Sequence, residues 1–184
     1  MRELSLHLLD IAENSVASGA SQIKIRVVEA IKIDLLQMSV EDNGKGMDAA
    51  MVASVTDPFV TSRTTRKVGL GIPLLKEAAE ACNGFLTITS QVGVGTTVFV
   101  QFQRSHIDRM PLGDIAETFL TLLIANPAIH WLFHYQVDDE AFDFDDAPIK
   151  TELDGLPYTE PDILNFLRET IETGIQDVRA RDIG

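Results

Sequence analysis

The sequence is poor in cysteine and lacks long apolar runs, and each shortage excludes a class of protein. Cys82 is the single cysteine among 184 residues, so no disulfide framework and no cysteine-based zinc site can form within the chain. No apolar run approaches the roughly 18 residues that a membrane-spanning helix needs. The amphipathic start after Met1 does not resemble a signal peptide. We therefore expect a cytoplasmic protein without a membrane partner, in which Cys82 is a buried thiol.

Basic residues are also scarce, and their distribution is uneven. The chain has 15 Lys and Arg against 28 Asp and Glu, for a net charge of −13. Residues 1–103 carry 11 acidic and 9 basic side chains, whereas residues 104–184 carry 17 and 6. Binding to the phosphate backbone of nucleic acid depends on Lys and Arg, so we expect no nucleic-acid partner. The composition predicts one domain over residues 1–103 and a small acidic α/β module over residues 104–184.

Hydrophobic periodicity predicts alternating helices and hairpins in the first segment. Apolar residues recur at helical spacing in the first helix and alternate with polar residues in the strands, and Gly19 is a natural helix stop. The predicted helices cover residues 3–18, 49–55 and a stretch that Gly69-Leu70-Gly71-Ile72-Pro73 opens and Asn83-Gly84 ends. The predicted strands form two hairpins, over residues 22–40 and 85–102. This order predicts an α+β sandwich with helices on one face of a largely antiparallel sheet.

The second segment is predicted to contain two helices and one strand. The helices cover residues 111–125 and about 160–178, and the strand covers residues 129–137. Between them lies an acidic run, residues 138–146. Its carboxylates could bind Ca²⁺, but the glycine and terminal glutamate of an EF-hand are missing. We interpret this run as a solvated acidic loop.

One face of the first helix carries polar side chains that could do chemistry. At 100° per residue, Glu3, His7, Asp10 and Asn14 fall within about 60° of arc, and the apolar residues take the other side. A carboxylate and a carboxamide one turn apart can hold a hydrated Mg²⁺, which prefers oxygen ligands. The alternative is an ordinary solvated helix face.

Two glycine-containing turns suggest a nucleotide. In Asp42-Asn43-Gly44-Lys45-Gly46, small residues let a planar ligand approach the backbone, and a buried Asp can accept a hydrogen bond from an exocyclic amine. Gly69-Leu70-Gly71 stands at the start of a helix, where free N–H groups favour phosphate. It is neither a Walker loop nor a Rossmann fingerprint, because no Gly-Lys-Ser/Thr follows it and no strand precedes it.

Four segments in order resemble one ATPase superfamily. They are LHLLDIAENSVASGA (6–20), DNGKGM (42–47), PFVTSRTTRKVGLGI (58–72) and GVGTT (93–97). They resemble the N, G1, F/G2 and last-strand boxes of the GHKL ATPases, which comprise gyrase, the ninety-kilodalton heat-shock chaperone, histidine kinases and MutL. The resemblance covers about residues 3–103, is greatest to histidine-kinase catalytic domains over residues 58–102, and implies the two-layer Bergerat α/β sandwich.

The resemblance also implies the cofactors ATP and Mg²⁺ and a role for particular residues. Asn14 would be the Mg²⁺ ligand and Asp42 the acceptor for the adenine amine. The residues that would shape the adenine pocket or hold the base are Gly44, Gly46 and either Thr96 or Thr97. The residues that would lie on the phosphates are Gly69, Leu70 and Gly71, with Arg63, Arg66 and Lys67 from a mobile basic loop whose alternative is a solvated charged surface.

Water activation has two candidate residues. Asp10, four residues before Asn14, matches the glutamate that acts as general base in MutL-like proteins and anti-sigma kinases, although its side chain is shorter. Glu13 is the second candidate, and His7 is expected to be a hydrogen-bonded structural residue.

The sequence thus predicts a stand-alone Mg·ATP-binding protein of the histidine-kinase-like type. Its activity would be slow ATP hydrolysis or phosphoryl transfer to a partner protein, which the acidic C-terminal module would select. The alternative is a non-catalytic regulatory module whose partner affinity depends on bound nucleotide.

Overall fold

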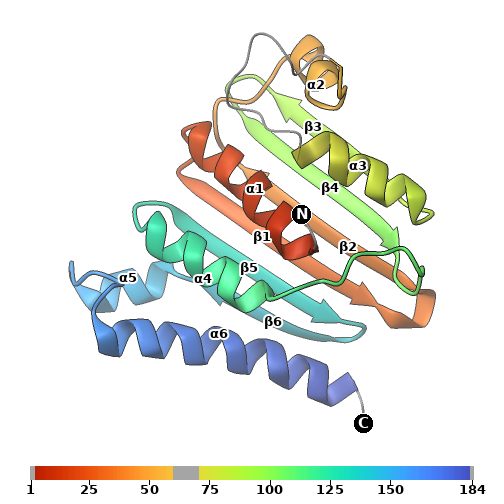
Figure 1. The fold of residues 1–184 in the computed structure, drawn as a ribbon. Coiled ribbons are helices and arrows are strands. Elements are labelled where there is room, and N and C mark those ends of the chain that lie inside the picture. The colour runs from red at the N-terminus through yellow and green to blue at the C-terminus, as the bar shows by residue number, and fades with distance from the viewer. Residues whose placement is uncertain (1–2, 60–70, 183–184) are drawn as a thin grey trace.

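The computed structural model describes residues 3–59 and 71–182, which form one six-stranded sheet and six α-helices (Figure 1). None of the described helices is both long and apolar enough to cross a membrane. In chain order the elements are α1 (Leu4–Ala17), β1 (Gln22–Ala30), a 3-10 turn (Ile31–Ile33), β2 (Leu35–Asp42), α2 (Ala49–Val55), α3 (Gly71–Ala81), β3 (Phe85–Gln91), β4 (Gly95–Gln103), α4 (Ile115–Ala125), β5 (His130–Val137), β6 (Glu140–Asp145), α5 (Ala147–Leu153) and α6 (Pro161–Asp182).

The strands lie in the order β3-β4-β2-β1-β5-β6. All neighbouring pairs are antiparallel except β1 and β5, which are parallel. The parallel pair runs from Gln22 opposite His130 to Glu29 opposite Val137. The sheet therefore continues across the composition boundary near Arg104, because β5 of the acidic segment pairs with the central strand β1.

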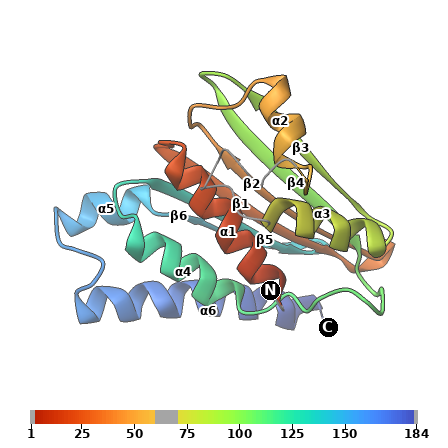
Figure 2. The same cartoon turned by 45° about the horizontal axis from the view of Figure 1, so that its top comes forward.

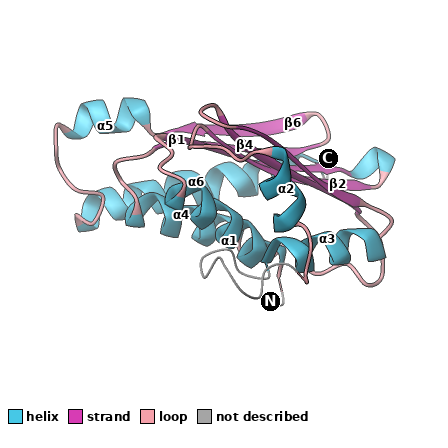
Figure 3. Cartoon of the chain, turned by 90° about the horizontal axis from the view of Figure 1, so that it is seen from above, coloured by secondary structure: helices cyan, strands magenta, loops and turns pink. Residues whose placement is uncertain are grey.

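Helices cover one face of this sheet. Figure 3 shows α1, α3, α4 and α6 on the same side of the strands, and Figure 2 shows them side by side in the order α3, α1, α4, α6. Strand residues alternate accordingly: Ile23, Ile25 and Val27 are buried under the helices, whereas Lys24 and Arg26 point to the uncovered face. The result is the two-layer Bergerat α/β sandwich, as predicted.

One hydrophobic core runs through both segments of the chain. In the acidic segment it is built on aromatic rings: Phe119 of α4 stacks on Phe133 of β5 with centroids 4.7 Å apart, and Trp131 meets the same ring edge-on. Cys82 is buried, as expected. Most predicted elements are present within a few residues of their predicted limits, and Gly19 follows α1 with a φ of +79°.

The prediction of a solvated loop over residues 138–146 was wrong. Residues 140–145 form β6, which pairs with β5 along its length. The physical reason is alternation: Phe142 and Phe144 pack on the helix side, and Asp143 points to the uncovered face. The density of carboxylates concealed this two-residue period. The short helix α5 that follows was also not predicted.

Candidate functional site

The polar face of α1, the end of β2 and the start of α3 lie next to one another. Helix α1 packs on both α3 and β2, and Asp42 is the last residue of β2. In the neighbouring strand β4, Thr96 is directly opposite Asp42. The sheet therefore presents Asp42 and Thr96 on the face that α1 covers.

The carboxylate of Asp42 is buried and held by two donors. Asp42 as a whole residue is 9% exposed. The hydroxyl of Ser15 donates to Oδ2 at 2.6 Å, and the N–H of Gly44 donates to Oδ1 at 2.9 Å. An ionised carboxylate accepts about four hydrogen bonds, so this group retains acceptor capacity in a fixed orientation. It can receive a donor from a ligand, such as an amine.

The turn after Asp42 requires its glycines. A Cβ on Gly44 would lie 1.9 Å from Oγ of Ser18, and a Cβ on Gly46, whose φ is +69°, would lie 2.0 Å from the carbonyl oxygen of Gln91. The backbone of Lys45 bridges the same two neighbours, because its N–H donates to Ser18 and its carbonyl accepts from Gly93. Gly44 and Gly46 therefore keep the turn pressed between α1 and the β3–β4 hairpin.

Thr96 and Thr97 point to opposite faces of the sheet. Thr96 shares the side of Val98 and Val100, which are buried under the helices, and its hydroxyl lies 2.8 Å from that of Ser90. Ser90 also accepts from the N–H of Met47, at 2.8 Å. Thr97 is opposite Glu41, on the uncovered face. Only Thr96 is on the side of Asp42.

The three α1 side chains singled out from the sequence differ in their surroundings. Asp10 is half-buried and packs against α3, since a Cβ on Gly71 would lie 1.8 Å from its Oδ2. Asn14 is half-buried, and its carboxamide has no hydrogen-bond partner among the described residues. Glu13 is exposed. Asp10 thus lies at the junction of α1 and α3, and Asn14 follows it by one turn on the same helix.

The remaining candidates could not be placed. Arg63, Arg66, Lys67, Gly69 and Leu70 lie outside the described residues. Gly71 is described and opens α3.

Two hydroxyl residues of this region were missed at the level of sequence, Ser15 and Ser90. Ser15 lies four residues after Ile11 and three after Ala12, on the apolar stripe of α1, and it is 5% exposed. A hydroxyl on the buried stripe of a helix needs a hydrogen-bond partner, which is the signal that could have identified it. Ser90 carries no comparable signal.

A hollow of about 340 Å³ opens at the ends of the central strands. It contacts Asp42, but much of its lining comes from the uncovered face, including Lys24, Glu41, Thr89 and Thr97. Neither Asp10 nor Asn14 lines it. It is therefore distinct from the junction of α1 and α3.

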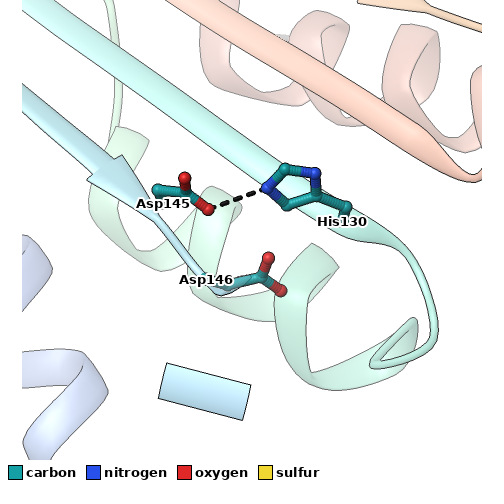
Figure 4. Close-up of side chains that lie close together, drawn as sticks. All are labelled: His130, Asp145 and Asp146. Atoms are coloured by element: carbon teal, nitrogen blue, oxygen red, sulfur yellow. Dashed lines mark hydrogen bonds and ion pairs between the residues drawn. The ribbon is translucent and has the colours of Figure 1, made fainter. Parts of the chain in front are cut away.

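A group with metal-ligand chemistry occurs in the acidic segment (Figure 4). His130 Nε2 lies 2.8 Å from Asp145 Oδ1, and Asp146 is next to this pair. Asp146 is fully buried, and its oxygens already accept from the N–H of Trp131 and the hydroxyl of Tyr158 and form an ion pair with Lys150. These interactions give the group a structural explanation, because Asp146 links β5, α5 and the loop before α6.

Comparison with known proteins identifies the family of the chain. A family profile described as histidine kinase-, DNA gyrase B-, and HSP90-like ATPase matches residues 1–106. An NtrY-like sensor histidine kinase of Rickettsia conorii is 28% identical over 108 residues, which are 59% of this chain and 18% of that protein. The sensor protein kinase FleS of Pseudomonas aeruginosa is 37% identical over 58 residues, 32% of this chain and 14% of that protein. The chain thus spans less than a fifth of these relatives.

Among solved structures, the ATPase domain of Aquifex aeolicus MutL complexed with ADP has a TM-score of 0.50 and covers 94% of this chain and 70% of that chain. At 14% sequence identity, this likeness shows a shared fold and nothing further. The profile match spans more than half of the chain and includes every box on which the resemblance rested. The chain therefore belongs to the histidine kinase-, DNA gyrase B- and HSP90-like ATPase family.

Proposed function

We propose that this protein binds ATP with Mg²⁺ at the junction of α1, β2 and α3. The observation that supports this most is the Asp42 carboxylate, which is buried, oriented by Ser15 and Gly44, and left with acceptor capacity. This is the group that an adenine amine requires, because a carboxylate accepts and cannot donate. Gly44, Gly46 and Thr96 would complete the adenine pocket.

The phosphates would lie between α1 and the start of α3. Free N–H groups at the start of a helix favour phosphate oxygens. Gly71 opens α3, and Gly69 and Leu70 come directly before it in the sequence. Asn14 would hold Mg²⁺, since its carboxamide oxygen is a suitable ligand and has no partner among the described residues. The metal would neutralise phosphate charge, and Arg63 and Lys67 would add to that neutralisation.

The proposed activity is slow ATP hydrolysis or phosphoryl transfer to a partner protein in signalling. Asp10 would accept the proton of the attacking water or hydroxyl, with Glu13 as the second candidate. A non-catalytic regulatory module is the alternative, and two observations favour it. The Asp10 carboxylate packs against Gly71, and Glu13 is exposed, with no partner among the described residues to orient it.

The partner would meet the acidic C-terminal segment. Lys150 is paired internally, with the buried Asp146. In contrast, the exposed carboxylates near the start of α6 have no ion-pair partner among the described residues: Glu152, Asp154, Glu160 and Asp162. A surface of uncompensated negative charge favours a basic partner surface.

The test is a titration of the purified chain with ATP, with and without Mg²⁺, followed by phosphate release under single-turnover conditions. We expect Mg²⁺-dependent binding of ATP and measurable phosphate release. The variant Asp10→Asn should keep its ATP affinity and lose about 10²- to 10⁴-fold in rate, because the amide cannot accept a proton. Binding without release in the wild type would support the regulatory alternative, and absence of binding would contradict both.

If the chain is a protein kinase, radiolabel from ATP should appear on a partner in a lysate. That label should fall in the Asp10→Asn variant in proportion to the rate. Labelling that is unchanged in this variant would remove Asp10 from the proposed reaction.

A further inference from the structure

Strand β3 is one edge of the sheet, and its outer side has no backbone partner among the described residues. On its inner side it pairs with β4 from Phe85 to Gln91. Outside that pairing, its backbone makes one hydrogen bond within the described chain, from the N–H of Val94 to the carbonyl oxygen of Gln91 in the β3–β4 turn. The outer N–H and C=O groups of β3 can therefore pair with another strand.

The two edges of the sheet differ in how they are protected. Natural edge strands commonly carry charged residues or proline, which discourage pairing with another chain. Strand β6 follows this rule, with Glu140, Asp143 and Asp145 among its six residues. Strand β3 reads Phe-Leu-Thr-Ile-Thr-Ser-Gln and has neither a charged residue nor a proline, and its β-branched and aromatic residues favour strand pairing. Such an unprotected edge is explained if another strand covers it.

Strand β3 is compatible with pairing to a second copy of itself. In an antiparallel pair about a twofold axis, all seven residues find a partner when Ile88 lies opposite Ile88. Phe85 is then opposite Gln91, and Thr87 is opposite Thr89. These four are the exposed residues of β3, and they lie on the uncovered face. The register therefore matches like faces of the two sheets and brings no two charges together.

The distribution of charge favours this edge over the other for contact between two copies. Residues 104–184 carry 17 acidic and 6 basic side chains, and they form β5, β6 and the helices α4 to α6. Figure 1 shows this segment on the side of the sheet away from β3. Two copies that meet at β3 keep their acidic segments at the two far ends, where repulsion is screened by salt. Contact through β6 would bring those segments together.

We propose that the outer edge of β3 is the interface of a homodimer, in which the β3 strands of two copies pair antiparallel and the two sheets become continuous. A twofold arrangement uses the same edge of both copies, so it leaves no β3 edge free for a third. The interface consists of one strand pair and is small, so the dimer is reversible and its fraction rises with concentration. This inference does not depend on nucleotide binding.

Sedimentation velocity of the full chain over a range of concentrations measures the dimer. One double variant carries Thr87→Lys and Thr89→Lys, and a second carries Thr87→Glu and Thr89→Glu. In the proposed register, residue 87 of one copy lies opposite residue 89 of the other, so each variant places like charges directly opposite one another. The control carries Gln37→Lys and Ser39→Lys, on the uncovered face of β2, the third strand from this edge.

We expect the wild type to dimerise and each β3 variant to raise the dissociation constant of the dimer by about tenfold or more. An equimolar mixture of the lysine and glutamate variants should restore the dimer, because each lysine then lies opposite a glutamate. The control should keep the wild-type dissociation constant. Circular dichroism establishes that each variant is folded, and rescue in the mixture separates a lost strand pair from damage to the fold.

A wild type that stays monomeric at every concentration would overturn the proposal and leave the edge to a strand of another protein. A dimer that both β3 variants retain would place the interface elsewhere and overturn it as well. Folded variants that remain monomeric when mixed would contradict the pairing of residue 87 with residue 89. Assembly of the wild type beyond a dimer would contradict the twofold arrangement.

Discussion

The hydroxyl of Ser15 donates a 2.6 Å hydrogen bond to Oδ2 of Asp42, which joins the core side of α1 to the end of β2. Both residues are buried. The bond fixes the carboxylate from one side while the N–H of Gly44 fixes it from the other. Ser15 is therefore part of the support of the proposed adenine acceptor.

We predict that Ser15→Ala lowers ATP affinity by about tenfold. A hydrogen bond to a charged group contributes roughly 1.5–3 kcal/mol, and 1.4 kcal/mol corresponds to a tenfold change. Calorimetric titration would measure the effect, with Ser39→Ala as the control because Ser39 is on the uncovered face of β2. Unchanged affinity in a folded Ser15→Ala variant would show that the bond serves stability alone.

Asn14→Ala should weaken the binding of Mg·ATP much more than the binding of metal-free ADP. The substitution removes a ligand oxygen and leaves Asp42 untouched. Parallel titrations with Mg²⁺ and with EDTA would measure the two affinities. Equal losses in both would assign Asn14 a structural role.

The two threonines of β4 offer a matched pair. We expect Thr96→Val to lower ATP affinity, by roughly three- to tenfold for a lost hydrogen bond, because Thr96 is on the face of Asp42. Thr97→Val should change it little, since Thr97 is on the opposite face. The reverse order of effects would place the base on the uncovered side of the sheet, next to the hollow lined by Lys24 and Glu41.

A chain shortened to residues 1–103 should not fold stably. It would lose β5, which pairs with β1 along eight residues, and would expose the edge of a central strand together with the face of α1 that packs on α4. Unpaired edges promote aggregation. Size-exclusion chromatography and circular dichroism would test this, and a soluble, cooperatively unfolding fragment would show that the first segment is an independent domain.

Local pattern was enough for most elements but not for their long-range pairing. The alternation of Ile23, Ile25 and Val27 predicts β1, yet nothing near it indicates that its second neighbour is β5, which begins more than a hundred residues later. Loop closure over such a distance leaves no local signature. Strand β6 was missed because its carboxylates outweighed the two-residue period of Phe142 and Phe144.

Part of the candidate site could likewise be predicted from local sequence pattern. Asp42 could be singled out from its place between a strand and two glycines, and the structure shows that it is buried, while its role as the adenine acceptor stays a prediction. The choice between Thr96 and Thr97 was available in principle, because Thr96 shares the parity of the apolar Val98, Val100 and Phe102. The close approach of Asp10 to Gly71 was not readable, since it depends on how two helices distant in sequence pack.

The most direct test of the account is the affinity of Asp42→Asn for ATP. The amide would present its own donor to the adenine amine, and losing a buried hydrogen bond while adding an unfavourable contact costs roughly 2–4 kcal/mol, about 30- to 1000-fold in affinity. Titration calorimetry with Mg·ATP, on a variant shown to be folded by circular dichroism, would measure it. The account predicts that binding falls by this amount or is lost, and wild-type affinity in the folded variant would contradict the adenine site.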